Sequence, residues 1–242
     1  MEDPDGDLER NPNTGRGGAS REPGERGLDV GMPVESGATR PCRLHRARLI
    51  LVHMSENPPA GQKEKMLAGQ LYMATDPELS AAHLRAQAIL AKFNATSADA
   101  EAERHTLLTE LFERLGERTV LKPTLRCDYG FNVAIGNRTF INYDCLLLDC
   151  NRITIGDEVQ IAPGVHIYTA THPIEAKARR SGIEYALPVV IGDGVWLGGR
   201  AVVCPGVTIG ANTVVGAGSV VTRDLPANVI AVGNPCRVIR QL

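Results

Sequence analysis

The sequence predicts a mainly β protein whose larger part is a parallel β-helix, preceded by a small helical region and a disordered N-terminal leader. The main observation is an apolar residue at every sixth position near the C-terminus. A period of six fits neither a helix nor a pleated strand, but it is typical of a coil whose short strands form three flat walls. The residues of this period are Ile191, Leu197, Val203, Ile209, Val215 and Val221.

The N-terminal segment lacks the composition of a packed domain. Its first 53 residues are rich in Gly, Pro, Asp, Glu and Arg and show no sustained apolar period. Such a segment cannot bury enough apolar surface to offset the entropy lost on ordering. We therefore expect residues 1–61 to form a disordered leader, with Met54 as a candidate native start.

Residues 62–116 are expected to form the helical region. After a short first helix, the segment Asp76-Pro77-Glu78 is a strong helix start, because Asp caps, Pro occupies the first turn and Glu complements the helix dipole. Ser97 is expected to cap a third helix, which Gly116 would end. These signals predict helices in front of the coil.

Residues 117–242 are expected to form the β-helix domain and its C-terminal tail. The six-residue phase is already present upstream and slips by two residues after Ile141. It is lost altogether between Ile167 and Ile191, so we expect residues 168–190 to leave the coil as a loop. Polar loops of this kind often carry function.

Composition excludes several classes of protein. Among 242 residues, 26 Lys and Arg against 28 Asp and Glu give a net charge of −2, which argues against bulk nucleic-acid binding. No apolar run approaches the about 20 residues that cross a bilayer. The six cysteines form no C-x-x-C pair, which favours buried thiols in a reducing cytoplasm over disulfides or a metal site. We expect a cytoplasmic protein that needs no metal.

The chain resembles the maltose and galactoside O-acetyltransferases, which are hexapeptide-repeat acyltransferases, over residues 62–242. The motifs that carry the resemblance are KMLAGQLYMATDPEL (65–79), RCDYGFNVAIGN (126–137), FINYDCLLLDCNRITIGD (140–157), IAPGVHIYTATHP (161–173), PVVIGDGVWLGG (188–199) and VVGAGSVVTRDLPANVIAVGNPCRVIR (214–240). The resemblance implies a left-handed coil and a homotrimer with active sites between subunits. It also implies acetyl-CoA as donor and a sugar such as maltose or glucose as acceptor.

Acetyl transfer to an alcohol needs a base for the hydroxyl proton, and histidine suits this role near neutral pH. His172 stands where the six-residue period breaks and matches the family's catalytic histidine. His166, inside a regular repeat, is the next candidate. Asn142 could be a simple turn former, but it matches the family asparagine that contacts the acceptor and supports the transition state.

The resemblance also implies residues on the acceptor side. Asp128 and Trp196 match acceptor-binding positions, and Trp196 is expected to point outward from the coil. The family's acceptor-side aspartate aligns with Cys150, so we expect the neighbouring Asp149 to make this acceptor contact. Glu184, in the expelled loop, is expected to reach the same pocket.

Donor contacts are implied near the C-terminus. Coenzyme A needs cations and backbone groups for its phosphates, and the backbone N–H of Gly199 would stabilise the oxyanion. As isolated charges, the arginines would be ordinary solvated side chains. The matching positions are Gly199, Ala217, Thr222, Arg223, Arg237 and Arg240.

Three alternatives remain at this point. A serine-type or xenobiotic-type acetyltransferase shares the repeat and would take another alcohol or an amine. A γ-type carbonic anhydrase shares it too but needs three zinc-binding histidines, and only His166 and His172 stand close together. A non-catalytic β-helix scaffold would need neither a histidine on the loop nor arginines for coenzyme A.

Overall fold

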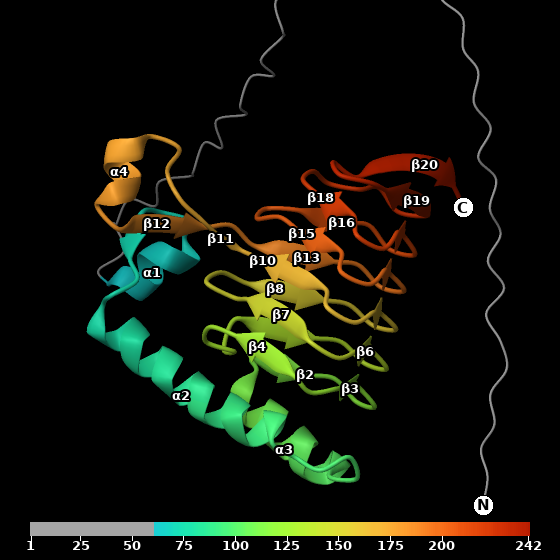
Figure 1. Cartoon of the computed structure of the whole chain (residues 1–242), viewed down its shortest axis with the longest axis horizontal. Coiled ribbons are helices and arrows are strands. Elements are labelled where there is room, and N and C mark those ends of the chain that lie inside the picture. Colours follow the sequence, from blue (N-terminus) through green and yellow to red (C-terminus); the bar gives the residue numbers. More distant parts are fainter. Residues whose placement is uncertain (1–60) are drawn as a thin grey trace, which may run out of the picture. The chain divides into compact units, whose positions relative to one another are not determined.

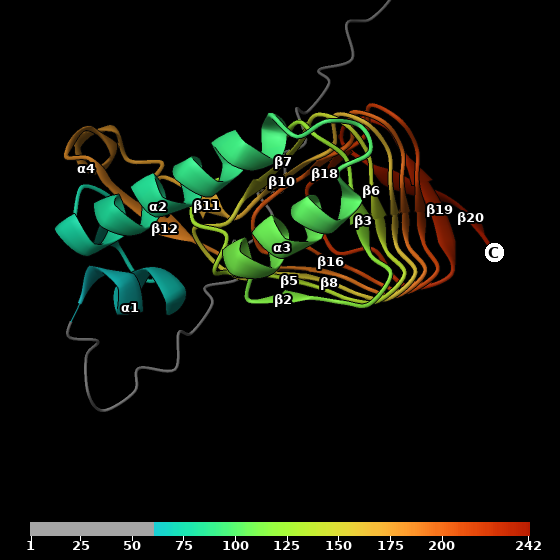
Figure 2. The same ribbon diagram turned by 90° about the horizontal axis from the view of Figure 1, so that it is seen from below.

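The computed structural model describes residues 61–242 (Figure 1). The predicted leader, apart from Gly61, and the candidate start Met54 lie outside the described residues. The described part is a β-helix, called the coil below, with helices across its first turns and a hairpin that projects from one corner, as Figure 2 shows from below.

Three sheets form the walls of the coil. The first contains β2 (Arg114–Leu115), β5 (Val133–Ile135), β8 (Ile153–Ile155), β13 (Val189–Ile191) and β16 (Thr208–Ile209). The second contains β3 (Val120–Leu121), β6 (Phe140–Ile141), β9 (Gln160–Ile161), β14 (Trp196–Leu197), β17 (Val214–Val215), β19 (Val229–Val232) and β20 (Arg237–Gln241). The third contains β4 (Leu125–Cys127), β7 (Cys145–Leu148), β10 (His166–Tyr168), β15 (Val202–Val203) and β18 (Val220–Val221).

The coil buries the residues that define the six-residue period. All strand pairs in the three walls are parallel except β19 with β20. Side chains alternate across a strand, so one residue in two points into the coil. The six residues from Ile191 to Val221 that carry the period are each at most 1% exposed. The predicted parallel β-helix is therefore confirmed.

The two-residue slip in the period reflects a longer corner. Ile135 pairs with Ile155, twenty positions later, whereas Ile191 pairs with Ile209, eighteen positions later. The early turns carry their two extra residues between the third and the first sheet. This enlarged corner includes Asp149, so it also helps to build the site described below.

In the described part of the chain, three helices precede the β-helix: α1 (Gln62–Leu67), α2 (Pro77–Asn94) and α3 (Glu101–Leu111). The predicted start of α2 is confirmed, since Asp76 Oδ1 accepts hydrogen bonds from the backbone N–H groups of Glu78 (3.0 Å) and Leu79 (3.4 Å). The apolar stripe of α2 covers the first turns of the coil.

The third helix differs from its prediction at both ends. It begins after Ala100, and the Ser97 hydroxyl bonds the side chain of Asp99 (2.6 Å) in place of the helix. It ends at Leu111, not near Gly116, because residues 114–115 extend to pair with β5. The coil therefore begins slightly earlier than the sequence predicts, because pairing with a buried strand overrides a weak helical stripe.

The segment expelled from the coil is a structured hairpin. It contains β11 (Ala170–Thr171), the short helix α4 (Ala176–Arg180) and β12 (Ile183–Ala186). The N-terminal strand β1 (Tyr72–Met73) pairs antiparallel with β12, so residues far apart in sequence form one small sheet. This sheet anchors the loop that carries His172.

Candidate active site

The third sheet separates the predicted site residues into two groups. Parallel strands place their amino ends at one edge of a sheet and their carboxyl ends at the other. Asn142 lies just before β7, whereas His172 lies beyond β10, the strand that pairs with β7. With about 3.3 Å per residue along a strand, roughly 10 Å of sheet lies between the two edges. One chain does not bring His172 and Asn142 together.

His172 lies beside a carboxylate of the hairpin. Its Nε2 is 3.8 Å from Oε2 of Glu184, whose side chain is only 15% exposed, while the imidazole is 53% exposed. This separation exceeds a hydrogen bond but allows an ion pair when the ring is protonated. The second oxygen of Glu184, Oε1, accepts a hydrogen bond from the hydroxyl of Tyr72.

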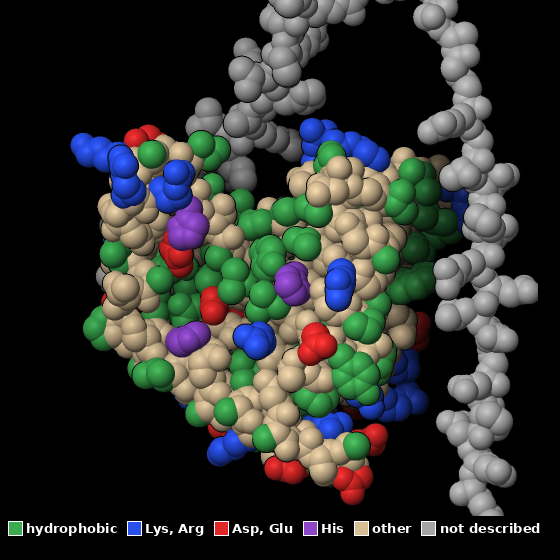
Figure 3. Space-filling model, viewed as in Figure 1, with side chains coloured by type: hydrophobic (Ala, Val, Ile, Leu, Met, Phe, Trp, Pro, Cys, Tyr) green, Lys and Arg blue, Asp and Glu red, His purple; other side chains and the backbone are tan. Residues whose placement is uncertain are grey.

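A cavity of about 500 Å³ lies next to this pair, between the hairpin, the enlarged corner and α2. Figure 3 shows histidine and acidic side chains grouped on this face, between α4 and α2. The cavity is lined by Ala74, Leu79, Ser80, His83, Leu84, Asp128, Tyr129, Cys150 and Glu184. It therefore brings together two predicted acceptor-side residues, Asp128 and Glu184, and Cys150, which stands at the position of the family's acceptor-side aspartate.

His83 also lines this cavity, although the sequence does not single it out as a site residue. Its Nδ1 lies 3.1 Å from the backbone oxygen of Asp128 and 3.8 Å from Oδ1 of the same residue. The spacing along the helix could have indicated this position, because His83 comes four residues after the buried Leu79 and so lies on the same face of α2. The cavity thus has a histidine on its α2 wall.

Cys150 is a hydrogen-bond donor in this cavity. Its Sγ donates to Oδ2 of Asp128 at 3.1 Å. Burial, together with the neighbouring Asp128, raises the pKa of this thiol well above its usual range. The thiol therefore stays protonated and holds the Asp128 carboxylate in place, while Oδ1 of this carboxylate faces His83.

Asp149 does not suit the acceptor contact expected of it. Its side chain is 0% exposed. Its Oδ1 accepts from the backbone N–H groups of Asp128 and Tyr129, both at 2.9 Å, and Oδ2 accepts from that of Asn132 at 3.4 Å. Asp149 instead braces the enlarged corner that carries Asp128, because the extra residues of this corner lack strand partners.

We expect Asp149 to make stability depend on pH. Burial raises its pKa to about 7, so between about pH 4 and pH 7 the carboxyl is ionised when unfolded but protonated when folded. The free energy of unfolding should therefore fall as pH rises through this window, by up to about 4 kcal/mol. In urea unfolding at pH 5 and pH 7.5, Asp149→Asn should lose this slope. An equal slope in both proteins would contradict the assignment.

The corner between the second and third sheets contains Asn142, Gly199 and Ala217. The Asn142 backbone N–H donates to the backbone oxygen of Ile161 in the next turn. The Gly198 N–H makes the equivalent bond to the oxygen of Val215, so Gly199 and Ala217 lie at this corner in later turns. Trp196, on β14 of the adjoining wall, is 53% exposed, which confirms that it points outward. Asn142 also acts as a turn former, because its Oδ1 accepts a hydrogen bond from the Tyr143 backbone N–H at 2.8 Å.

The residues near the C-terminus that are predicted to contact coenzyme A are accessible. Thr222 and Arg223 follow β18 and are exposed, as are Arg237 and Arg240 on β20. Within residues 61–242, none of these three arginines forms an ion pair with a carboxylate. Arg237 donates to the backbone oxygen of Cys236 at 2.8 Å. These side chains can therefore contact an anionic ligand.

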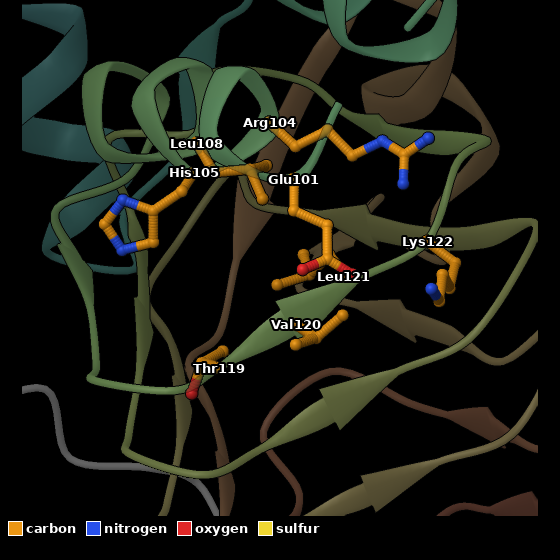
Figure 4. A pocket seen from close by; sticks show the side chains of 8 residues that line it. All are labelled: Glu101, Arg104, His105, Leu108, Thr119, Val120, Leu121 and Lys122. Carbon is orange, nitrogen blue, oxygen red and sulfur yellow. The ribbon is translucent and has the colours of Figure 1, made fainter. Parts of the chain in front are cut away.

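A second cavity, of about 170 Å³, lies between α3 and β3 (Figure 4). Its lining includes Glu101, Arg104, His105 and Lys122 but none of the predicted site residues. Over residues 61–242, no group of three or more His, Cys, Asp or Glu side chains is arranged to bind a metal ion. No helix in this range has the length and apolar character required to span a bilayer.

Two family models match the chain. Residues 65–116 match the maltose acetyltransferase hexapeptide capping motif, and residues 188–223 match the bacterial transferase hexapeptide with six repeats. The first match runs from the end of α1 through α2 and α3 to β2, and the second covers turns of the β-helix after the hairpin.

Known proteins resemble the chain over most of their own length. Nodulation protein L of Rhizobium meliloti is 48% identical, over 73% of this chain and 97% of the relative. Galactoside O-acetyltransferase of Escherichia coli is 39% identical, over 74% and 88%. A crystal structure of a maltose O-acetyltransferase from Clostridium difficile superposes with a TM-score of 0.74 at 50% identity, over 75% and 97%.

A structure of galactoside acetyltransferase in complex with coenzyme A superposes with a TM-score of 0.73 at 39% identity, over 76% of this chain and 92% of that one. Identity at this level over nearly whole relatives, together with the capping-motif match, shows the family. The chain therefore belongs to the maltose and galactoside O-acetyltransferases, a family of acetyl-CoA-dependent enzymes.

Proposed function

We propose that the protein transfers the acetyl group of acetyl-CoA to a hydroxyl of a sugar such as maltose or glucose, with His172 as the general base. The observation that carries this proposal is the position of His172. It lies 3.8 Å from Glu184, which lines a cavity of about 500 Å³ together with Asp128. Carboxylates that accept from hydroxyl groups, next to a histidine, suit a polyhydroxylated acceptor.

In the proposed reaction, the imidazole removes the proton from the acceptor hydroxyl as its oxygen attacks the thioester carbonyl carbon. The tetrahedral intermediate then collapses with cleavage of the carbon–sulfur bond, and the imidazolium returns the proton to the leaving thiolate of coenzyme A. The nearby Glu184 carboxylate stabilises the imidazolium between these two steps. The products are an acetyl ester and free coenzyme A, so no other reactant is needed.

The corner with Asn142 is proposed to hold the thioester. The Gly199 N–H donates to no backbone acceptor within the described range, so it is available to the oxyanion. Ala217, in the same column, would contact the pantetheine arm through its backbone. We propose that the exposed Thr222, Arg223, Arg237 and Arg240 bind the phosphates, which is supported by the absence of carboxylate partners for the three arginines among the described residues.

Since the two groups of residues lie at opposite edges of one sheet, we infer that each active site forms between two copies of the chain in a homotrimer. One subunit would supply His172, Glu184 and Asp128. Its neighbour would supply Asn142, Trp196 and Gly199. Closed cyclic symmetry would generate three equivalent sites.

Mixing two inactive variants tests this arrangement. His172→Ala and Asn142→Ala each impair every site of their own trimer. In mixed trimers from equal co-expression, one interface in four should combine an intact His172 with an intact Asn142, so about a quarter of the wild-type activity should return. Activity that stays at the level of the single variants, in trimers shown by mass spectrometry to be mixed, would place both residues in one subunit.

We also propose a cytoplasmic location. Cys127, Cys145, Cys150 and Cys236 are buried free thiols, and Cys204 is a half-buried one. Unpaired thiols of this kind are typical of a reducing compartment.

A further inference from the structure

Tyr72 comes from the N-terminal strand, yet it reaches the residues around His172. Within the small sheet, Tyr72 and Glu184 are direct cross-strand partners, so their side chains share one face. The Tyr72 hydroxyl donates to Oε1 of Glu184, and its ring is 1% exposed. Glu184 Oε2, at the other end of the same carboxylate, faces His172 Nε2 at 3.8 Å.

We propose that Tyr72 is a positioning residue for acetyl transfer: by binding one oxygen of Glu184, it directs the other oxygen toward His172. This inference rests on the proposed role of His172 as the base. The terminal torsion of a glutamate is broad, so the orientation of its carboxylate is set by the hydrogen bonds it receives. Tyr72 is the one side chain in the described range that donates such a bond to Glu184.

The surroundings of Tyr72 keep it a donor. Burial, and then the neighbouring Cys150 and Glu184, raise the pKa of its phenol far above the usual range. The hydroxyl therefore stays protonated at any pH at which the enzyme works. Its packing also connects Glu184 to Cys150, which in turn bonds Asp128, so the carboxylates on both sides of the cavity are held by neutral donors.

This role differs from packing alone. Tyr72→Phe retains the ring but removes the bond to Glu184. The carboxylate can then rotate away from His172, which misplaces the group that stabilises the imidazolium. Small errors in such placement are costly to turnover but leave a donor site in the opposite corner intact.

The test is a double-mutant cycle read by steady-state kinetics. Tyr72→Phe should lower kcat about 10-fold, with the KM for acetyl-CoA and the thermal midpoint nearly unchanged. In a Glu184→Gln background, the same substitution should change kcat less than about 2-fold, because the group it positions is already lost. Tyr185→Phe is the matched control, since Tyr185 follows Glu184 on β12 and its hydroxyl bonds no described residue; it should keep the wild-type kcat.

The outcomes separate this inference from the proposed function. A normal kcat in Tyr72→Phe, while His172→Ala is inactive, would overturn the role of Tyr72 and leave the base in place. An equal loss with and without Glu184 would mean that Tyr72 acts by another route, which also overturns it. A normal kcat in His172→Ala would instead remove the proposed function on which the inference rests.

Discussion

His172→Ala should lower kcat by roughly 10²–10⁴-fold, the usual contribution of a general base. The imidazole is half-exposed beside Glu184 and makes no hydrogen bond within the described range, so its removal should leave the fold intact. Binding of acetyl-CoA should also survive, because the proposed phosphate contacts lie on other elements. Steady-state kinetics with an accepted sugar, together with calorimetry of coenzyme A binding, measures both quantities.

The opposite effect is expected at the C-terminal strand. The double variant Arg237→Ala, Arg240→Ala should raise the KM for acetyl-CoA and retain most of kcat, because charge-assisted contacts to phosphates act on ground state and transition state alike.

If His172→Ala kept a near-normal kcat, the base would lie elsewhere. His166, which bonds the Tyr168 hydroxyl through Nδ1 at 2.7 Å, would then be the next residue to replace.

Gly136→Ala should destabilise the coil strongly. Gly136 begins a corner between the first and second sheets, and a Cβ there would lie 2.3 Å from Asp157 Oδ1 and 2.5 Å from the backbone carbonyl of Gly156. The next turn of the coil occupies this space, so relief requires the backbone to move. We expect a loss of about 3 kcal/mol in the free energy of unfolding and a thermal midpoint lower by about 10 °C.

Gly218→Ala is the matched control, because no atom lies within 4 Å of its added Cβ. Its φ of +67° costs an alanine roughly 1 kcal/mol, so some loss is expected from conformation alone. Calorimetry should rank the Gly136 variant well below the Gly218 variant. Equal midpoints would show that the turns of the coil can move apart and that close stacking does not decide stability.

Local spacing was enough to predict the coil. A residue such as Leu197 is buried because its position in the six-residue repeat turns its side chain inward, and that position can be read from the neighbouring sequence alone. The handedness came from the family resemblance. The end of α3 was predicted wrongly, because the pairing of residues 114–115 with β5 depends on a strand twenty positions away.

The candidate site was predictable only in part for the same reason. Position in the repeat placed His172 on the expelled segment and Trp196 on the outer surface. Tyr72 reaches Glu184 and His83 reaches the cavity from the region that precedes the β-helix, and no local pattern shows which distant element they meet. Asp149 was assigned by its neighbour Cys150, but strand alternation turned its carboxylate inward, onto the backbone of the corner.

The most direct test of the proposed function is the release of coenzyme A thiol from acetyl-CoA with and without an acceptor. The screen should include maltose, glucose, galactosides and non-sugar alcohols, with mass spectrometry of the products. We expect release to rise several-fold when a sugar is added, and the product to carry one acetyl ester that hydroxylamine cleaves. Thiol release that no sugar increases, or acetylation of an amine in preference to a hydroxyl, would contradict sugar O-acetylation by this protein.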